Sequence, residues 1–310
     1  MSFELIILGS SSALPTSKRS TAAHLLNINE RFFLIDCGEG AQIQMRRLRL
    51  SPARINHIFI SHLHGDHVFG LFGLISSLGL MGRNADLHLY GPSGLEELLD
   101  SCFGFFGTLP FSLVHHCVEN GQIVFEDSKT EVRAIELLHR TPTFGYLFKE
   151  KPKMLNIRKD KIEDYRLGVE EIVRVKKGED LITSNGVIPN RELTYPPWHC
   201  RSYAYISDTA YFPEIANIIQ DVDLLFHEAT FLERDRKLAL ETYHSTAMQA
   251  ATIALKAKAK KLLIGHFSTR YKDSNEFRAE AEQFFKSVVC VSDGDRYHID
   301  MYREEEENFT

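Results

Sequence analysis

The feature of this 310-residue sequence that most constrains its fold is a run of metal-ligand residues directly after an apolar segment. The run from His62 to His67 reads His-Leu-His-Gly-Asp-His, and it follows the strand-like residues 55–60. A strand end that opens into a Gly-containing loop lets such side chains converge on one or two cations, whereas a helix would spread them over its faces. Three imidazoles and one carboxylate suit zinc. The segment therefore predicts a metal site at a strand end.

Two metal ions need more ligands than this run supplies, so other parts of the chain should contribute. Three residues qualify because each directly follows an apolar run that predicts a strand: His139 after residues 134–138, Asp208 after residues 203–207, and His266 after residues 262–265. Strand ends that share one edge of a sheet bring such side chains together. The histidines that fall inside strand patterns are instead expected to be structural: His24, His57 and His88.

Apolar runs alternate with helical patterns along the first third of the chain. Strands are predicted at residues 3–8, 22–28, 31–35, 55–60 and 86–90, with helices ending near Leu48 and spanning residues 68–80 and 95–102. The second half has a similar layout, with strands at residues 203–206, 222–226 and 261–264 and an alanine-rich helix at residues 245–258. We predict one α/β domain spanning residues 1–310, because two-layered α/β architectures often reach this length.

Residues 149–197 interrupt this rhythm with four prolines and mostly polar sequence. Within residues 149–178, ten Lys or Arg stand against six Asp or Glu, a local net charge of +4 in a chain whose formal net charge is -6. That overall charge disfavours wholesale coating of nucleic acid, so an RNA partner would have to meet a local basic surface or metal ions. The segment predicts an inserted arm.

The composition bounds the compartment and the class of protein. The five cysteines are widely spaced and form no Cys-x-x-Cys pair, which is typical of a reducing compartment. The first residues carry no basic segment, and the apolar run at residues 5–8 is too short for a signal sequence or a membrane span. We therefore expect a soluble cytoplasmic protein with no membrane partner.

The run from His62 to His67 resembles the H-x-H-x-D-H signature of the metallo-β-lactamase superfamily. This resemblance implies an αββα sandwich that holds two metal ions at one edge. Further segments, spread over nearly the whole chain, resemble the ribonuclease Z family of tRNA 3′-processing endonucleases. They are residues 9–15 with Asp36-Cys37-Gly38-Glu39-Gly40, His139 with Phe144-Gly145-Tyr146, Ser207-Asp208-Thr209, His227-Glu228-Ala229-Thr230, His244-Ser245-Thr246-Ala247 and His266-Phe267-Ser268-Thr269-Arg270-Tyr271.

The resemblance to this family implies two zinc ions per chain and three catalytic residues. The implied ligands are His62, His64 and His139 for one ion and Asp66, His67 and His266 for the other, with Asp208 as the bridge. Asp66 would accept or orient the proton of the attacking water. Glu228 would fix the tautomer of His244, which would give a proton to the leaving 3′ oxygen. The implied reaction removes the 3′ trailer of precursor tRNA and leaves a 3′-hydroxyl on the tRNA.

The family likeness also implies that the arm at residues 149–197 grips the precursor tRNA and that the protein is a homodimer. Phosphate contacts far from the cleavage site position a large substrate without reading its sequence. Many bacterial members carry a Gly-Pro-rich tip in this arm, whereas Leu167-Gly168-Val169 stands near that place here. One alternative is a hydrolase of small phosphodiesters, sulfate esters, thioesters or lactones. A non-enzymatic RNA-binding protein is disfavoured, because every expected ligand is present.

Overall fold

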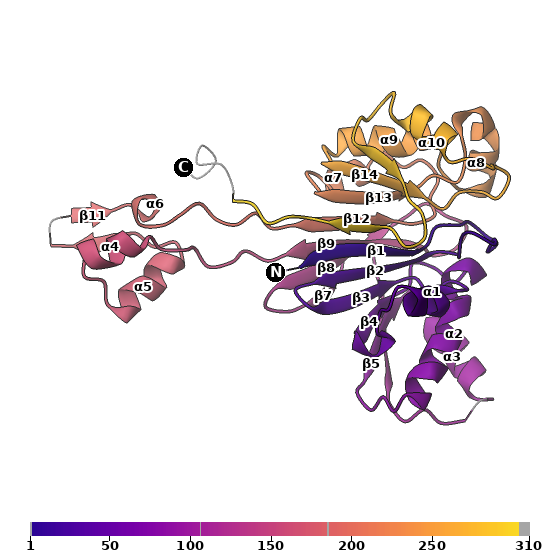
Figure 1. Cartoon of the computed structure of the whole chain (residues 1–310), viewed down its shortest axis with the longest axis horizontal. Coiled ribbons are helices and arrows are strands. Elements are labelled where there is room, and N and C mark those ends of the chain that lie inside the picture. Colours follow the sequence, from indigo (N-terminus) through magenta and orange to yellow (C-terminus); the bar gives the residue numbers. More distant parts are fainter. Residues whose placement is uncertain (1, 106, 185, 304–310) are drawn as a thin grey trace.

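The computed structural model describes residues 2–105, 107–184 and 186–303. Two seven-stranded sheets pack face to face and helices cover their outer faces, so the predicted αββα sandwich is confirmed (Figure 1). The first sheet has the order β16-β1-β2-β3-β4-β5-β6. Its strands are β1 (Phe3–Gly9), β2 (Ala23–Ile28), β3 (Arg31–Ile35), β4 (Ile55–Phe59), β5 (Leu87–Gly91), β6 (Leu113–Cys117) and β16 (Arg296–His298), and its helices are α1 (Ala41–Arg47), α2 (Gly65–Leu80) and α3 (Leu95–Phe103).

The second sheet has the order β15-β14-β13-β12-β9-β8-β7. Its strands are β7 (Ile123–Glu126), β8 (Thr130–Glu136), β9 (Phe144–Glu150), β12 (Ser202–Ile206), β13 (Leu224–Glu228), β14 (Lys261–Gly265) and β15 (Val288–Cys290), and its helices are α7 (Ile215–Ile218), α8 (Arg236–Thr242), α9 (Ala247–Lys256) and α10 (Asn275–Ala281). The apolar patterns do not predict β6 or β7, whose residues are only partly buried. Among the helices that the structure describes, none has the length and apolar character needed to cross a bilayer.

Apolar layers hold the sandwich together on three levels. Aromatic side chains such as Phe33, Phe59 and Tyr146 fill the space between the sheets. Leu71 and other residues of α2 pack on the outside of the first sheet, and the alanine face of α9 packs on the outside of the second. The start of α9 is fixed by a capping box, in which the side chains and backbone N–H groups of Thr246 and Gln249 bond reciprocally.

Strand direction places several chain segments at one edge of the sandwich. Strands β3 to β6 run parallel in the first sheet, and β12 to β15 run parallel in the second. The carboxyl ends of parallel strands share an edge. The residues after β4 and β12 meet across the sandwich, since Ser207 Oγ donates a hydrogen bond to Ser61 Oγ at 3.0 Å. Loops from both halves of the chain can therefore build one site there.

Residues between β9 and β12 leave the sandwich as a long arm (Figure 1). A stalk of two extended segments, residues 151–158 and 194–201, carries a tip with α4 (Lys159–Asp164), α5 (Val169–Lys176), β10 (Leu181–Thr183), β11 (Gly186–Ile188) and α6 (Asn190–Leu193). The tip packs a small core of its own from Leu167, Val175, Leu181 and Leu193. The arm is thus a separately packed unit on a thin stalk.

Candidate metal centre

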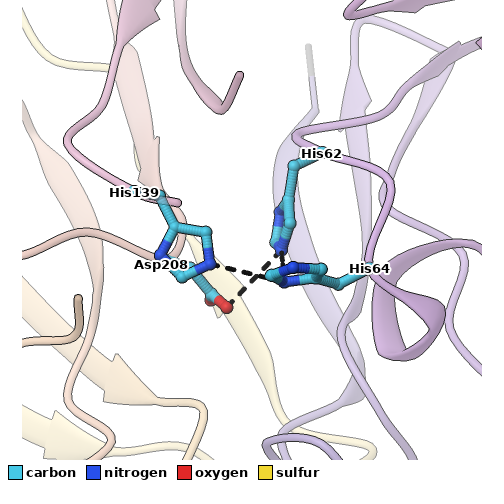
Figure 2. A group of neighbouring side chains, drawn as sticks. All are labelled: His62, His64, His139 and Asp208. Atoms are coloured by element: carbon cyan, nitrogen blue, oxygen red, sulfur yellow. Dashed lines mark hydrogen bonds and ion pairs between the residues drawn. The ribbon is translucent and has the colours of Figure 1, made fainter. Parts of the chain in front are cut away.

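Four side chains from both halves of the chain converge where the strands end (Figure 2). His62 and His64 follow β4, His139 follows β8 and Asp208 follows β12. His62 Nε2 lies 3.0 Å from His64 Nδ1 and 3.6 Å from Asp208 Oδ2, and His139 Nε2 lies 3.3 Å from His64 Nδ1. Ligand atoms that sit ~2.0–2.2 Å from one tetrahedral zinc ion lie roughly 3.3–3.6 Å apart. This first donor group fits a single ion.

A second donor group lies beside the first and consists of Asp66, His67, His266 and Asp208. His67 Nε2 lies 3.6 Å from both Asp66 Oδ2 and Asp208 Oδ1. His266 Nε2 lies 3.4 Å from Asp66 Oδ2 and 3.3 Å from Asp208 Oδ1. These separations are again those of ligands around one ion.

The structure corrects the expectation that the whole run from His62 to His67 forms a loop. Helix α2 begins at Gly65, three residues earlier than the apolar pattern predicts, so Asp66 and His67 lie in its first turn. His64 is the extended residue that precedes the helix, with φ -66° and ψ 147°. Neighbouring residues of a helical turn point in different directions, yet Asp66 and His67 still reach one point because the helix starts beside the strand end.

Asp208 joins the two donor groups through its separate oxygens. Oδ2 faces His62 and Oδ1 faces His67 and His266. Asp208 Oδ1 and His67 Nε2 are fully buried and have no hydrogen-bond partner among the described residues. A buried polar atom without a partner is costly, and a cation between these atoms removes that cost. The donor set therefore fits a pair of divalent ions that share Asp208.

Behind the donors lies a buried hydrogen-bond network centred on Asp36, the residue directly after β3. Asp36 Oδ2 lies 2.7 Å from His67 Nδ1 and accepts hydrogen bonds from Tyr205 Oη at 2.7 Å and Ser61 Oγ at 2.8 Å. Ser61 Oγ also lies 3.0 Å from His62 Nδ1. Such contacts fix the tautomer and orientation of a ligating imidazole. Sequence reasoning missed this role for Asp36, although its position after a strand is the signal that singled out Asp208.

Two further imidazoles of the donor groups, those of His139 and His266, are oriented by contacts with residues in the second half of the chain. His139 Nδ1 lies 3.0 Å from the Tyr243 carbonyl oxygen, and His266 Nδ1 lies 2.9 Å from Thr230 Oγ1. Both contacts use Nδ1, so Nε2 of each ring remains directed at the donor groups. The sequence pattern does not predict Tyr243 or Thr230 as supports.

Glu228 and His244 form a pair next to the second donor group. Glu228, at the end of β13, is fully buried and its Oε1 lies 3.2 Å from His244 Nδ1. It also accepts hydrogen bonds from Ser245 N at 2.7 Å and from Thr230 N at 2.8 Å. Burial raises the pKa of Glu228, but the charge and hydrogen bond of His244 outweigh it, so the net shift is downward. Burial lowers the pKa of His244, but the Glu228 and Asp208 carboxylates raise it to about 9.

The structure thus brings together every site residue named from the sequence, while the strand histidines lie elsewhere. His24 is buried between the sheets, where its Nδ1 contacts Tyr203 Oη at 2.8 Å and burial lowers its pKa to about 3. His57 and His88 stack on one another within the first sheet, with ring centroids 5.2 Å apart. None of these three histidines belongs to a donor group among the described residues.

Comparisons with known proteins place the fold and the site in context. A family model described as Anti-Pycsar protein Apyc1 matches residues 3–102, and one described as a beta-lactamase superfamily domain matches residues 198–267. The chain is 50% identical over 293 residues to ribonuclease Z of Bacteroides thetaiotaomicron, covering 93% of each protein. It is 44% identical over 301 residues to ribonuclease Z of Parabacteroides distasonis, covering 96% of this chain and 99% of the relative.

Solved structures agree with these relatives. The crystal structure of the short form of human tRNase Z matches with a TM-score of 0.69 and 26% identity, over 95% of this chain and 98% of the human chain. The Bacillus subtilis protein YhfI, at 15% identity and a TM-score of 0.69, shares the fold. The sandwich and its paired donor groups are those of a hydrolase with the metallo-β-lactamase fold. The sequence identity to the curated relatives decides which family within this fold the chain belongs to. The chain belongs to the ribonuclease Z family.

Proposed function

We propose that the chain is a zinc-dependent endoribonuclease that cleaves the 3′ trailer from precursor tRNA and leaves a 3′-hydroxyl on the tRNA. The observation that carries the chemistry is the sharing of Asp208 between two donor groups. Relatives named ribonuclease Z and a structural neighbour named tRNase Z support the choice of substrate. The unbroken donor set argues for a working enzyme rather than an RNA-binding remnant.

We assign two zinc ions to each chain because five imidazoles dominate the donor set. His62, His64 and His139 would hold one ion, Asp66, His67 and His266 the other, and Asp208 both. When bound, such a pair lowers the pKa of water and offsets the negative charge that grows on the phosphate. Asp66 Oδ2 accepts a hydrogen bond from Ala13 N at 2.8 Å, which holds the carboxylate in place to orient the attacking water.

The Glu228–His244 pair supplies the proton for the leaving 3′ oxygen. Because His244 Nδ1 faces Glu228, the other ring nitrogen is the one left to meet the substrate. The carboxylate stabilises the protonated imidazole, which is the form that acts as an acid. Both side chains thus act on the leaving group, while Asp66 acts on the nucleophile.

We assign contact with the tRNA to the arm because its first part, residues 149–178, carries a net positive charge and because the arm projects from the sandwich. The strand β12 begins at the root of the arm and ends two residues before Asp208, so the arm and the metal centre lie at opposite ends of one strand. A large RNA that rests on the arm is therefore directed away from the centre of the same chain. In a homodimer, the arm of each chain could hold an RNA that enters the metal centre of the partner. Exposed Ile43 of α1 and Phe69 of α2 offer apolar surface for such a dimer. The widely spaced cysteines support a cytoplasmic site of action.

The decisive experiment incubates the zinc-loaded protein with a precursor tRNA and, in parallel, with lactone, thioester and sulfate ester substrates. We expect cleavage at the 3′ end of the tRNA body, loss of that cleavage in Asp66→Ala, and a tRNA product whose terminal diol is oxidised by periodate. A product resistant to periodate would contradict the 3′-hydroxyl. Turnover of only the small esters would overturn the assignment to RNA.

A further inference from the structure

Residues 299–303 run along the returning segment of the stalk, at the yellow end of the chain in Figure 1. The segment is attached to the sandwich at its start, where Ile299 N donates to the Phe3 carbonyl oxygen at 3.0 Å and Arg201 Nη1 donates to the Ile299 carbonyl oxygen at 2.9 Å. At its end, Arg303 forms an antiparallel bridge with Trp198. The stalk therefore consists of three extended segments at this level.

Arg303 connects the two original segments of the stalk through one side chain. On the returning segment, its guanidinium lies over the Trp198 ring at 4.2 Å and the Tyr195 ring at 5.1 Å, and Nη1 donates to the Pro196 carbonyl oxygen at 2.5 Å. On the outgoing segment, the side-chain amide of Asn156 is assigned the orientation that satisfies both neighbouring donors. In that orientation its oxygen accepts hydrogen bonds from Arg303 Nη2 and from Trp198 Nε1, at 3.1 Å each. A guanidinium suits this place because it stacks and donates several hydrogen bonds at once.

Tyr302 connects the returning segment to the body of the protein. Its ring stacks on His199 with centroids 4.4 Å apart and planes at 17°. Its hydroxyl lies 3.4 Å from Asp223 Oδ1, and Asp223 is buried directly before β13. Lys260 Nζ lies over the same ring at 4.4 Å and donates to Asp223 at 2.7 Å. Through these contacts, Tyr302 attaches the returning segment of the stalk to the second sheet.

We propose that residues 299–303 are a brace for the arm, with Tyr302 and Arg303 as positioning residues that hold the stalk at a fixed angle to the sandwich. A ribbon of two strands is only marginally stable by itself, and a third segment anchored on the body stiffens it. The inference rests on the proposed role of the arm in holding tRNA. A loosened arm spends a smaller fraction of its time in the orientation that binds tRNA. The affinity for tRNA then falls in proportion to that fraction.

The state of the brace can be read directly, because Trp198 is the single tryptophan of the chain and lies against Arg303. We expect Arg303→Met and Tyr302→Ala to shift the Trp198 emission to longer wavelength and to increase its quenching by acrylamide. Tyr302→Phe keeps the ring on His199 but loses the hydroxyl contact with Asp223, so it should shift the emission less than Tyr302→Ala does. The control Arg278→Met removes an equal charge from α10, where Arg278 pairs with Glu282 just beyond the helix, and should leave the emission unchanged.

Kinetics on the zinc-loaded enzyme test the consequence. If loosening reduces the productive orientation to a fifth, KM for precursor tRNA rises about 5-fold in Arg303→Met and Tyr302→Ala, with kcat retained. Hydrolysis of a small chromogenic phosphodiester, which does not reach the arm, should be unchanged. If Arg303 instead contacts an RNA phosphate directly, Arg303→Met should lower the slope of log affinity against log salt concentration by ~1. Tyr302→Ala should then leave both the slope and KM unchanged. That pattern would overturn the brace.

A variant without the tip separates the brace from the role of the arm. Arg158 N donates to the Leu193 carbonyl oxygen at 2.8 Å, so residues 159–192 can be replaced by a short glycine linker. If this excision raises KM for precursor tRNA while the brace variants do not, the brace is wrong and the arm retains its role. If the excision leaves KM for precursor tRNA unchanged, the role of the arm in binding tRNA and the role of the brace are both wrong. A raised KM in all three supports both.

Discussion

Glu150 and Arg201 form a buried bidentate ion pair at the point where the arm leaves and rejoins the second sheet. The two N–O distances are both 2.9 Å, and each side chain is 1% exposed. Asn29 Nδ2 donates a further hydrogen bond to Glu150 Oε1 at 2.9 Å. Burial raises the pKa of Glu150, but the hydrogen bonds from Arg201 and Asn29 outweigh it, and the net shift is downward.

Replacing Glu150 with glutamine should destabilise the fold in a pH-dependent way. The change leaves the Arg201 charge buried without its partner, which costs about 3–5 kcal/mol. A carboxyl whose pKa is lower in the folded state contributes stability above its unfolded pKa and loses it as pH falls through the folded pKa. The deficit in the free energy of unfolding, measured with urea, should therefore be largest near neutral pH and shrink below the ordinary value of 4.5.

The exposed pair of Glu126 and Lys151 provides the matched control for this change. Because water screens that pair, Glu126→Gln should cost less than about 1 kcal/mol at any pH. A deficit for Glu150→Gln that matches this control, or that stays constant as the pH falls from neutral to well below 4.5, would refute the proposed coupling between this ion pair and stability.

Removing the shared carboxylate should empty the metal centre in part or in full. Among the described residues, Asp208 is the one whose oxygens face both donor groups, so we expect Asp208→Ala to retain one metal ion per chain or none, against two in the unaltered protein. Elemental analysis after desalting measures the content, and circular dichroism checks the fold. Asp160→Ala, on the exposed surface of the arm, should keep the full content. Two ions retained in Asp208→Ala would show that the bridge is misassigned.

The acid role of His244 predicts a dependence on the leaving group. Loss of general acid catalysis costs about 10²–10⁴-fold in rate when the leaving oxygen needs a proton. We expect His244→Ala to reduce kcat on precursor tRNA within that range and to spare bis(p-nitrophenyl) phosphate, whose leaving group departs without a proton. Equal losses on both substrates would instead place His244 in the binding of metal or phosphate.

Asp36 should set metal affinity without touching a metal. In Asp36→Asn, one carboxylate oxygen becomes an amide nitrogen, which cannot accept from Ser61, His67 and Tyr205 as Asp36 does. Loss of such a support typically weakens metal binding about 10- to 100-fold, as competition with a chromogenic chelator would measure. Asp100→Asn on exposed α3 is the control. An unchanged affinity in Asp36→Asn would contradict this prediction.

The sequence predicts those parts of the fold and site that local patterns encode. A ligand-type side chain directly after an apolar run can be recognised without coordinates, which is why the sequence predicts that His139, Asp208 and His266 lie together at one site. The sequence pattern predicts the start of α2 three residues too late, because the apolar periodicity begins only at Val68. Edge strands β6 and β7 escaped detection because their half-buried residues do not alternate cleanly.

Contacts between distant residues could not be predicted in the same way. The Asp36 carboxylate meets Ser61 25 residues away and Tyr205 169 residues away, and no spacing rule links such partners. The brace at residues 299–303 is short and carries no periodic pattern, so its place on the stalk depends on the folded sandwich. Only a three-dimensional structure brings these groups together.

The separate core of the arm tip has an evolutionary consequence. Leu167, Val175, Leu181 and Leu193 stabilise the tip from within, so its surface can be altered without disturbing the packing beneath the metal ligands. On the proposed role of the arm, insertions, deletions or exchange of the whole tip would change which RNAs are captured while the hydrolytic chemistry persists. Substrate choice and bond cleavage would then be encoded in different stretches of the gene and could diverge at different rates.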